Sequence, residues 1–364
     1  MTLPTTNAIR DRLVALGRAC GFEPYTERSP GVPKSYAPRT DLVLAGTPLT
    51  REAAQRIDAI AEAASLSSPL VGGRPPVVGI EIEGTDPTTK TMEADLLNLH
   101  VTGFPISVLA VDSAPGGARK NVGDIQCRAS RLRRTLAIWT GIRPIAIVDA
   151  SRITSSPIVS PGRRAVSSKP APVTNQGGSR EDARRMRDSI FALGTRLGLR
   201  VETDATPEVL EVLFDARAVC GEAAARVLLG VAGFDVCAGT VGTFAKFDTA
   251  FTAHATDILW SAEPLADLDQ FHRSLAAADP DFGVFWPRCP FERCGIPLVA
   301  FEIDSGISKH TAGSLLHLAR SARLGVLVVP DERVSAAREL IETYRRVVPV
   351  GGVVVAGFSE VARW

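Results

Sequence analysis

Apolar and polar residues alternate along the chain in patterns that predict short strands between amphipathic helices. Residues 106–112 read "ISVLAVD" and residues 324–331 read "LGVLVVPD", which are apolar runs of strand length. Residues 9–27 read "IRDRLVALGRACGFEPYTE", where apolar residues recur at helical spacing until a glycine, and a strand-like stretch follows. The pattern predicts an α/β or α+β fold in which each central mixed sheet is flanked by helices.

The same order of elements occurs twice. Residues 186–204 read "MRDSIFALGTRLGLRVETD" and align with residues 9–27 without gaps. The identical pairs are Arg10/Arg187, Asp11/Asp188, Ala15/Ala192, Leu16/Leu193, Gly17/Gly194, Gly21/Gly198 and Thr26/Thr203. Each half reads helix, three strands, helix, strand, helix, strand. We therefore expect two copies of one fold, related by duplication and packed as an internal pseudo-dimer.

Composition places the boundary between the two copies. Residues 154–180 are rich in Ser, Pro, Gly and Arg and have no hydrophobic period, which is typical of a flexible linker. The first copy then spans 1–153 and the second 181–364. The second copy contains additional sequence at about 205–278, rich in Ala, Val and Leu, which we interpret as a largely helical insert.

The overall charge and hydropathy limit the class of protein. The formal net charge is +1, so contact with nucleic acid must depend on local basic patches and not on a strongly positive surface. The first residues lack the apolar core of a signal peptide, and no run of about 18 apolar residues could span a membrane. These features predict a cytoplasmic protein without a membrane partner.

Pairs of acidic residues interrupt two of the predicted strands. Residues 79–84 read "GIEIEG" and residues 301–304 read "FEID". Because residues i and i+2 of a strand face the same side, Glu81 and Glu83 point together, as do Glu302 and Asp304. Two neighbouring carboxylates repel each other, and burial increases the cost. A divalent cation, Mg²⁺ or Mn²⁺, would compensate for this charge at both places.

A metal site usually takes a further acid from a neighbouring strand. In the first half the candidate is Asp41, within "YAPRTDLVLAG". In the second half we favour Asp281 in "DPDFGVFW", because a short hairpin would bring it beside Glu302. Asp215 in "VLFDARAV" is the alternative, since it lies nearer the repeat position of Asp41.

An acid on one strand followed by an acidic pair on the next strand and then a helix resembles the PD-(D/E)XK nuclease superfamily. The stretches "DPDFGVFW…PLVAFEIDSGISK…LLHL" and "TDLVL…VVGIEIEGTDPTTK…DLLNL" carry the resemblance. It covers the core of both halves, but neither the linker nor the insert. The resemblance implies two restriction-endonuclease-like domains.

The resemblance also implies roles for individual residues. The metal ligands would be Asp41 and Glu81 in the first half, and Asp281 and Glu302 in the second. Glu83 and Asp304 stand where the family usually has lysine, and would orient or deprotonate the attacking water. Lys90 and Lys309 occupy matching positions after the acidic strands and would stabilise charge on the phosphate. A solvent-exposed lysine is the alternative interpretation of each.

Two functions from different classes follow from this resemblance. The first is a metal-dependent endonuclease, with one or both copies active, that cleaves double-stranded DNA in a prokaryotic restriction or antiviral defence context. The second is an inactive nuclease fold that binds nucleic acid or serves as a scaffold in a defence complex with protein partners. We expect either a monomer with an internal pseudo-dimer or a homodimer.

Overall fold

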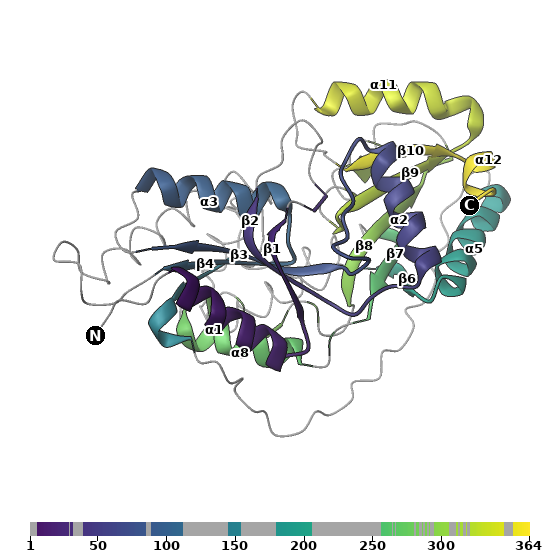
Figure 1. Cartoon of the computed structure of the whole chain (residues 1–364). Helices are drawn as coiled ribbons and strands as arrows, with labels where there is room; N and C mark the ends of the chain where they lie inside the picture. Colours follow the sequence, from purple (N-terminus) through teal and green to yellow (C-terminus); the bar gives the residue numbers. More distant parts are fainter. Residues whose placement is uncertain are drawn as a thin grey trace, which may run out of the picture.

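The structure is a computed structural model that contains two five-stranded mixed sheets flanked by helices (Figure 1). It describes residues 6–28, 30–31, 39–84, 89–111, 145–153, 180–205, 256–305 and 311–318 with short gaps, 321–345 and 352–364. The expected linker 154–180 lies outside these ranges except for Arg180. Within the described ranges, no helix is both long enough and apolar enough to cross a membrane.

The first half forms a sheet with strand order β1-β2-β3-β4-β5. β1, β2 and β3 are antiparallel neighbours, and β4 and β5 continue the sheet in parallel. Its elements are α1 (Thr6–Ala19), β1 (Glu23–Arg28), β2 (Thr40–Ala45), α2 (Arg51–Ala63), β3 (Pro76–Glu83), α3 (Thr89–Thr102), β4 (Ile106–Val111), β5 (Ile145–Asp149) and η1 (Ala150–Arg152).

The second half repeats this topology in the order β6-β7-β8-β9-β10, with the same antiparallel and parallel pairs. Its elements are α5 (Arg180–Arg196), β6 (Arg200–Ala205), β7 (Thr256–Ala262), α8 (Leu268–Ala278), β8 (Ile296–Ile303), β9 (Leu324–Val329), η2 (Asp331–Arg333), α11 (Val334–Arg345), β10 (Val353–Gly357) and α12 (Phe358–Val361). The repeated α+β sheet predicted from the sequence is therefore present, whereas its assignment to a nuclease family remains a prediction.

Pairing registers show how closely the two sheets correspond. Leu42 pairs with Ile80 in the first sheet, and Ile258 pairs with Phe301 in the second. Each antiparallel pair then shifts register at the same point, between Leu44 and Ala45 in β2 and between Trp260 and Ser261 in β7. A shared bulge at a shared position is difficult to explain by chance, because bulges depend on local sequence and pairing.

Strand β7 corrects our interpretation of residues 205–278 as an insert. Residues 256–278 contain β7 and α8, which are the second-half counterparts of β2 and α2; residues 206–255 lie outside the described part of the chain. The short run "TDILWSA" follows Ala-rich sequence, and a short apolar run cannot be assigned to strand or helix from periodicity alone.

The strand beside β8 also differs from our expectation. β7 pairs with β8 on the side where we expected "DPDFGVFW". The N–H of Trp286 donates to the Phe282 carbonyl at 2.8 Å.

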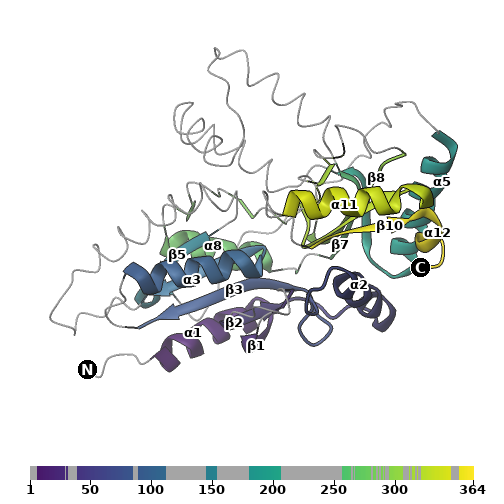
Figure 2. The same ribbon diagram turned by 90° about the horizontal axis from the view of Figure 1, so that it is seen from above.

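Helices α2 and α8 are exchanged between the two halves. Each follows the second strand of its own sheet, and each packs against the other sheet (Figure 1). α8 contacts β5 of the first sheet beside α1. α2 lies near β10, α12 and α5 of the second, as a view from above also shows (Figure 2). The second strand of each half is thus followed by a crossing to the other sheet.

The exchange joins the apolar interiors of the two halves into one core. Phe22 of the first half packs edge-to-face against Phe271 on α8, with ring centroids 5.3 Å apart. Residues of both sheets belong to the same buried cluster. Arg323, at the start of β9, donates to the Pro30 carbonyl and lies over the Phe104 ring at 5.4 Å. The two halves therefore stabilise one another through burial as well as hydrogen bonding.

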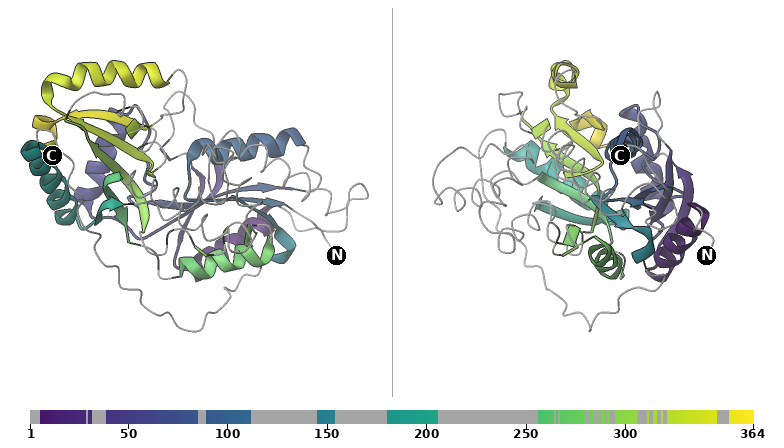
Figure 3. Two further views of the ribbon diagram at one scale, coloured as in Figure 1. Left: turned by 180° about the vertical axis from the view of Figure 1, so that it is seen from behind. Right: turned by 90° about the vertical axis from the view of Figure 1, so that its left-hand side faces the viewer.

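Helices cover the sheets in a way that leaves the acidic strand β3 between two layers. α3 contacts β3 and β4 on one face, and α1 contacts β2 and β3 on the opposite face. The view from behind shows the same arrangement, with α1 and α8 on the face away from α3 (Figure 3). In the second half, α5 covers β7 and β8 as α1 covers β2 and β3. The acidic strands β3 and β8 are thus each covered on one face by the first helix of their own half.

Asp279 links the halves by a buried hydrogen bond and provides a test of their coupling. Its carboxylate accepts from the N–H of Ile147 on edge strand β5 at 2.8 Å and from the N–H of Phe282 at 3.2 Å. We expect Asp279→Ala to lower the free energy of unfolding by about 2–3 kcal/mol, because two N–H groups lose their acceptor. Urea denaturation measures this change.

Asp279→Asn is the matched control, because it keeps one carbonyl oxygen as an acceptor, and it should lose about half as much stability. The two halves should still unfold in one transition, because they share a core. An Asp279→Ala variant as stable as the wild-type chain would contradict this account of the contact.

Candidate functional site

Strands β2 and β3 bring Asp41 and Glu81 together. The pairing of Leu42 with Ile80 places Asp41 opposite Glu81 at the next position of the antiparallel ladder. The backbone N–H of Ile82 donates to Asp41 Oδ2 at 2.9 Å, and the N–H of Asp41 lies 3.4 Å from Glu81 Oε2. The backbone thus fixes the acid of one strand against the acid of the next, as the sequence predicted.

Glu81 is the most deeply buried of these acids. Only 4% of its surface is exposed, and its Oε1 has no hydrogen-bond partner. Burial, followed by the charges of Asp41 and Asp95, raises the pKa of Glu81 to about 9. Without a cation this carboxyl is therefore protonated at neutral pH.

Helix α3 adds an acid that we did not predict from the sequence. Asp95 lies on α3, and its Oδ2 is buried without a hydrogen-bond partner. Burial, then hydrogen bonding to Glu83 and the charges of Glu83 and Asp41, raises the pKa of Asp95 to about 8. Asp41, Glu81, Glu83 and Asp95 therefore form one electrostatically connected cluster, which we call the first-half acid cluster.

The donor atoms of this cluster suit a hard divalent cation. All are carboxylate oxygens, which Mg²⁺ and Mn²⁺ prefer, and two of them are buried without a partner. Among the described residues, no three His, Cys, Asp or Glu side chains are already arranged around a common metal position. The carboxyls instead contact one another, as partly protonated acids do, so binding a cation requires them to lose protons and turn toward it.

Only one of the two predicted lysines can be located. Lys90 lies in the first turn of α3, after the acidic strand, and its side chain is exposed. It is therefore free to reach a ligand at the surface of the site. Lys309, its counterpart in the second half, lies outside the described residues.

In the second half, Asp257 occupies the position that corresponds to Asp41. The N–H of Ile303 donates to Asp257 Oδ2 at 2.8 Å, which reproduces the bond between Ile82 and Asp41. Asp257 belongs to β7, the strand directly beside Glu302 and its strand β8. Our expectation that Asp281 or Asp215 would complete this site omitted Asp257; both of those residues lie outside the described part of the chain.

The sequence does contain a signal for Asp257 that we overlooked. "TDLVL" at 40–44 and "TDILW" at 256–260 share a Thr-Asp pair followed by apolar residues. No comparable signal identifies Asp95, because its register in the second half is occupied by Ser314. A helix residue that reaches a strand acid is a tertiary contact, which local patterns do not report.

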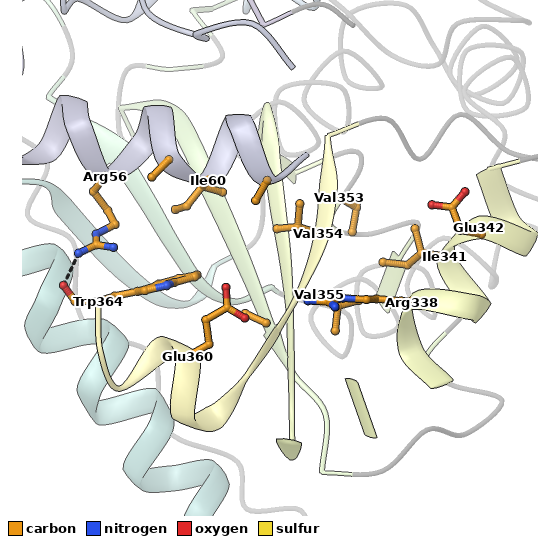
Figure 4. Close-up of a pocket in the computed structure, with 13 residues that line it drawn as sticks. Arg56, Ile60, Arg338, Ile341, Glu342, Val353, Val354, Val355, Glu360 and Trp364 are labelled. Atoms are coloured by element: carbon orange, nitrogen blue, oxygen red, sulfur yellow. Dashed lines mark hydrogen bonds between the residues drawn. The ribbon is translucent and has the colours of Figure 1, made fainter. Parts of the chain in front are cut away.

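A separate pocket of about 510 Å³ lies between α2 and the outer edge of the second sheet (Figure 4). Arg56 on α2 donates to the Trp364 carbonyl, and its guanidinium lies 5.8 Å from the centre of the Trp364 ring. Arg338 and Glu342 line the opposite side, beyond the valines of β10 (Figure 4). No member of the first-half acid cluster lines this pocket. The pocket has as many acidic as basic side chains in its lining, with Glu342 and Glu360 beside the two arginines, so it carries no excess of charge. We therefore place the candidate chemistry at the carboxylates.

Comparison of the chain with protein-family models, with curated proteins and with solved structures found no match.

Replacing Glu81 with glutamine should stabilise the chain in the absence of divalent cations. The pKa of Glu81 is about 9 in the folded chain and near 4.5 when unfolded. The contribution of Glu81 to stability is therefore fully present below pH 4.5 and is lost as the pH rises toward 9. Glu81→Gln removes this loss and should raise the free energy of unfolding by about 1–3 kcal/mol at pH 8.

Urea denaturation at pH 5 and pH 8 in EDTA measures the effect. Glu93→Gln is the matched control, because Glu93 is an exposed glutamate on α3. If wild type and Glu81→Gln lose the same stability between the two pH values, Glu81 is not the buried acid described here.

Proposed function

We propose that the chain is a metal-dependent endonuclease that hydrolyses phosphodiester bonds of nucleic acid, with double-stranded DNA as the expected substrate. The observation that carries this proposal is the β2–β3 junction, where backbone hydrogen bonds hold Asp41 against Glu81. The bond from Ile82 to Asp41 is repeated between Ile303 and Asp257, which supports a common origin of both sites. A mixed sheet with acids at this junction is also the arrangement that the resemblance to PD-(D/E)XK nucleases implies.

The residues of the first half take distinct roles in this proposal. Asp41 and Glu81 hold the cation, because they come from neighbouring strands and Glu81 carries a buried oxygen without a partner. When bound, the cation polarises the scissile phosphate and lowers the pKa of a water molecule. Glu83 lies on the same face of β3 as Glu81, where its carboxylate orients the attacking water and accepts its proton.

Strand β3 has no cationic side chain beside Glu81, so the positive charge that stabilises the scissile phosphate must come from another element. Glu83 occupies the position at which the resembled family usually has lysine. Lys90, exposed in the first turn of α3, is the candidate for contacting the phosphate oxygens. Lys309 would have the same role in the second half.

A second candidate function is nucleic-acid binding or scaffolding in a defence complex without cleavage. Two observations favour it. Glu83 and Asp304 replace the usual lysine in both halves. In addition, Arg187 already contacts Asp257, so that a side chain supplies the positive charge at the second junction.

Cleavage of nucleic acid distinguishes these functions. We expect the wild-type chain to cut plasmid DNA in the presence of Mg²⁺ or Mn²⁺ and to stop when EDTA is added. Asp41→Asn and Glu81→Gln should each lower the rate at least about 100-fold, because each removes one proposed ligand charge. Agarose gels with supercoiled plasmid, and gels with single-stranded DNA and RNA, report the activity and the substrate.

Asp58→Asn serves as the control, because Asp58 lies on α2 and contacts Ser68, away from the cluster. Activity that survives both ligand substitutions would place the chemistry elsewhere. Failure of the wild-type chain to cleave any of these substrates with either cation, while it still binds DNA, would favour the binding function.

A further inference from the structure

The two halves share a backbone junction but neutralise its charge in different ways. In each half an N–H of the acidic strand donates to the aspartate of the neighbouring strand. The side chains around these two aspartates differ. This difference determines where a cation is needed.

In the second half, a cationic side chain is already present. Arg187 on α5 donates to the Asp257 carbonyl at 3.0 Å, and its Nη2 lies 3.7 Å from Asp257 Oδ1. Thr311 donates to Asp304 Oδ2 at 2.6 Å. The arginine supplies charge, and the hydroxyl supplies a hydrogen bond to the second acid. The acids of this junction are thus satisfied by the chain itself.

In the first half, the equivalent groups are not satisfied in this way. Glu81 Oε1 is buried without a hydrogen-bond partner although only 4% of the Glu81 surface is exposed. Asp95 Oδ2 is also buried without a partner. Both acids influence each other electrostatically and lie close to Asp41. Unsatisfied carboxylate oxygens in a buried cluster indicate that a positively charged ligand belongs there.

The arginine itself is present in both copies, which makes the comparison sharper. Arg10 on α1 is the sequence counterpart of Arg187. Among the described residues Arg10 makes no ion pair with Asp41, whereas Nη2 of Arg187 lies 3.7 Å from Asp257 Oδ1. In the aligned sequence of the second half, Ser314 occupies the position that corresponds to Asp95. The first half therefore has one more carboxylate and one fewer arginine contact than the second.

We propose that the first half alone binds a divalent cation, through Asp41, Glu81 and the additional ligand Asp95, and that Arg187 takes the place of the cation in the second half. This inference rests on the proposed function and assigns its reactive centre to one copy. One reactive centre per chain also means that a monomer cuts one strand of a duplex in each encounter. Nicked plasmid should therefore accumulate before linear plasmid.

Mn²⁺ binding to the full chain tests the assignment without depending on catalysis. Electron paramagnetic resonance measures free Mn²⁺ during titration of the metal-free protein at pH 8. We expect one tight site per wild-type chain. Glu81→Gln and Asp95→Ser should each weaken it at least about tenfold, because each removes a carboxylate ligand. Asp95→Ser introduces the residue type that the second half has at this register.

The second half supplies the matched variants. Glu302→Gln, the counterpart of Glu81→Gln, should change Mn²⁺ affinity less than about twofold. Arg187→Met removes the positive charge beside Asp257 while keeping an unbranched side chain, and should create a second site per chain. Urea denaturation of each variant establishes that it is folded before titration.

Each outcome decides the assignment. Two equal sites in the wild-type chain, or loss of binding in Glu302→Gln but not in Glu81→Gln, would overturn it. No Mn²⁺ binding at all would overturn both this inference and the metal-dependent function. Binding that follows the expected pattern in a chain that cuts no nucleic acid would support the inference and reject the endonuclease.

Discussion

The hydrogen bond from the Ile82 N–H to the Asp41 carboxylate holds two acids against each other at a strand junction, and the arrangement of the site depends on it. Antiparallel register places Asp41 opposite Glu81, and the period of two along β3 aims Glu83 to the same side. α3 and α1 cover opposite faces of this region and exclude water from Glu81. Burial then raises the pKa of Glu81, so that the folded apo chain holds a proton where an ionised acid would need a counter-charge.

The exchange of α2 and α8 explains why two similar halves behave as one body. Each helix leaves its own sheet after the second strand and packs on the other sheet, so that one buried cluster contains residues of both halves. The second strand also carries the aspartate of each site. A change in how the halves pack would therefore act on β2 and β7 directly, and through them on Asp41 and Asp257. The Asp279 bond to edge strand β5 is part of the same coupling.

The two junctions share the same backbone hydrogen bond, whereas the side chains around them differ. Asp95 is present in one copy and replaced by Ser314 in the other. Arg187 contacts its aspartate, whereas Arg10 does not form the equivalent ion pair within the described residues. A tandem protein of this kind can keep one copy for reaction and one for architecture or substrate contact, because the fold requires both sheets but the proposed chemistry requires only one cation.

Local periodicity and internal repetition were sufficient to predict two α+β sheets and the acidic strands, because both follow from the strand period and from the repeated order of elements. That Asp41 lies beside Glu81 was expected from the short strand-like run that carries Asp41. The sequence analysis did not predict Asp257, although its Thr-Asp pair repeats that of Asp41, because the residues of β7 were interpreted as part of a helical insert. Only the tertiary structure decided three features: the place of Asp95 in the acid cluster, the exchange of α2 and α8, and the contact between Arg187 and Asp257. These depend on which surfaces are buried together, and burial between distant segments leaves no local pattern in the chain.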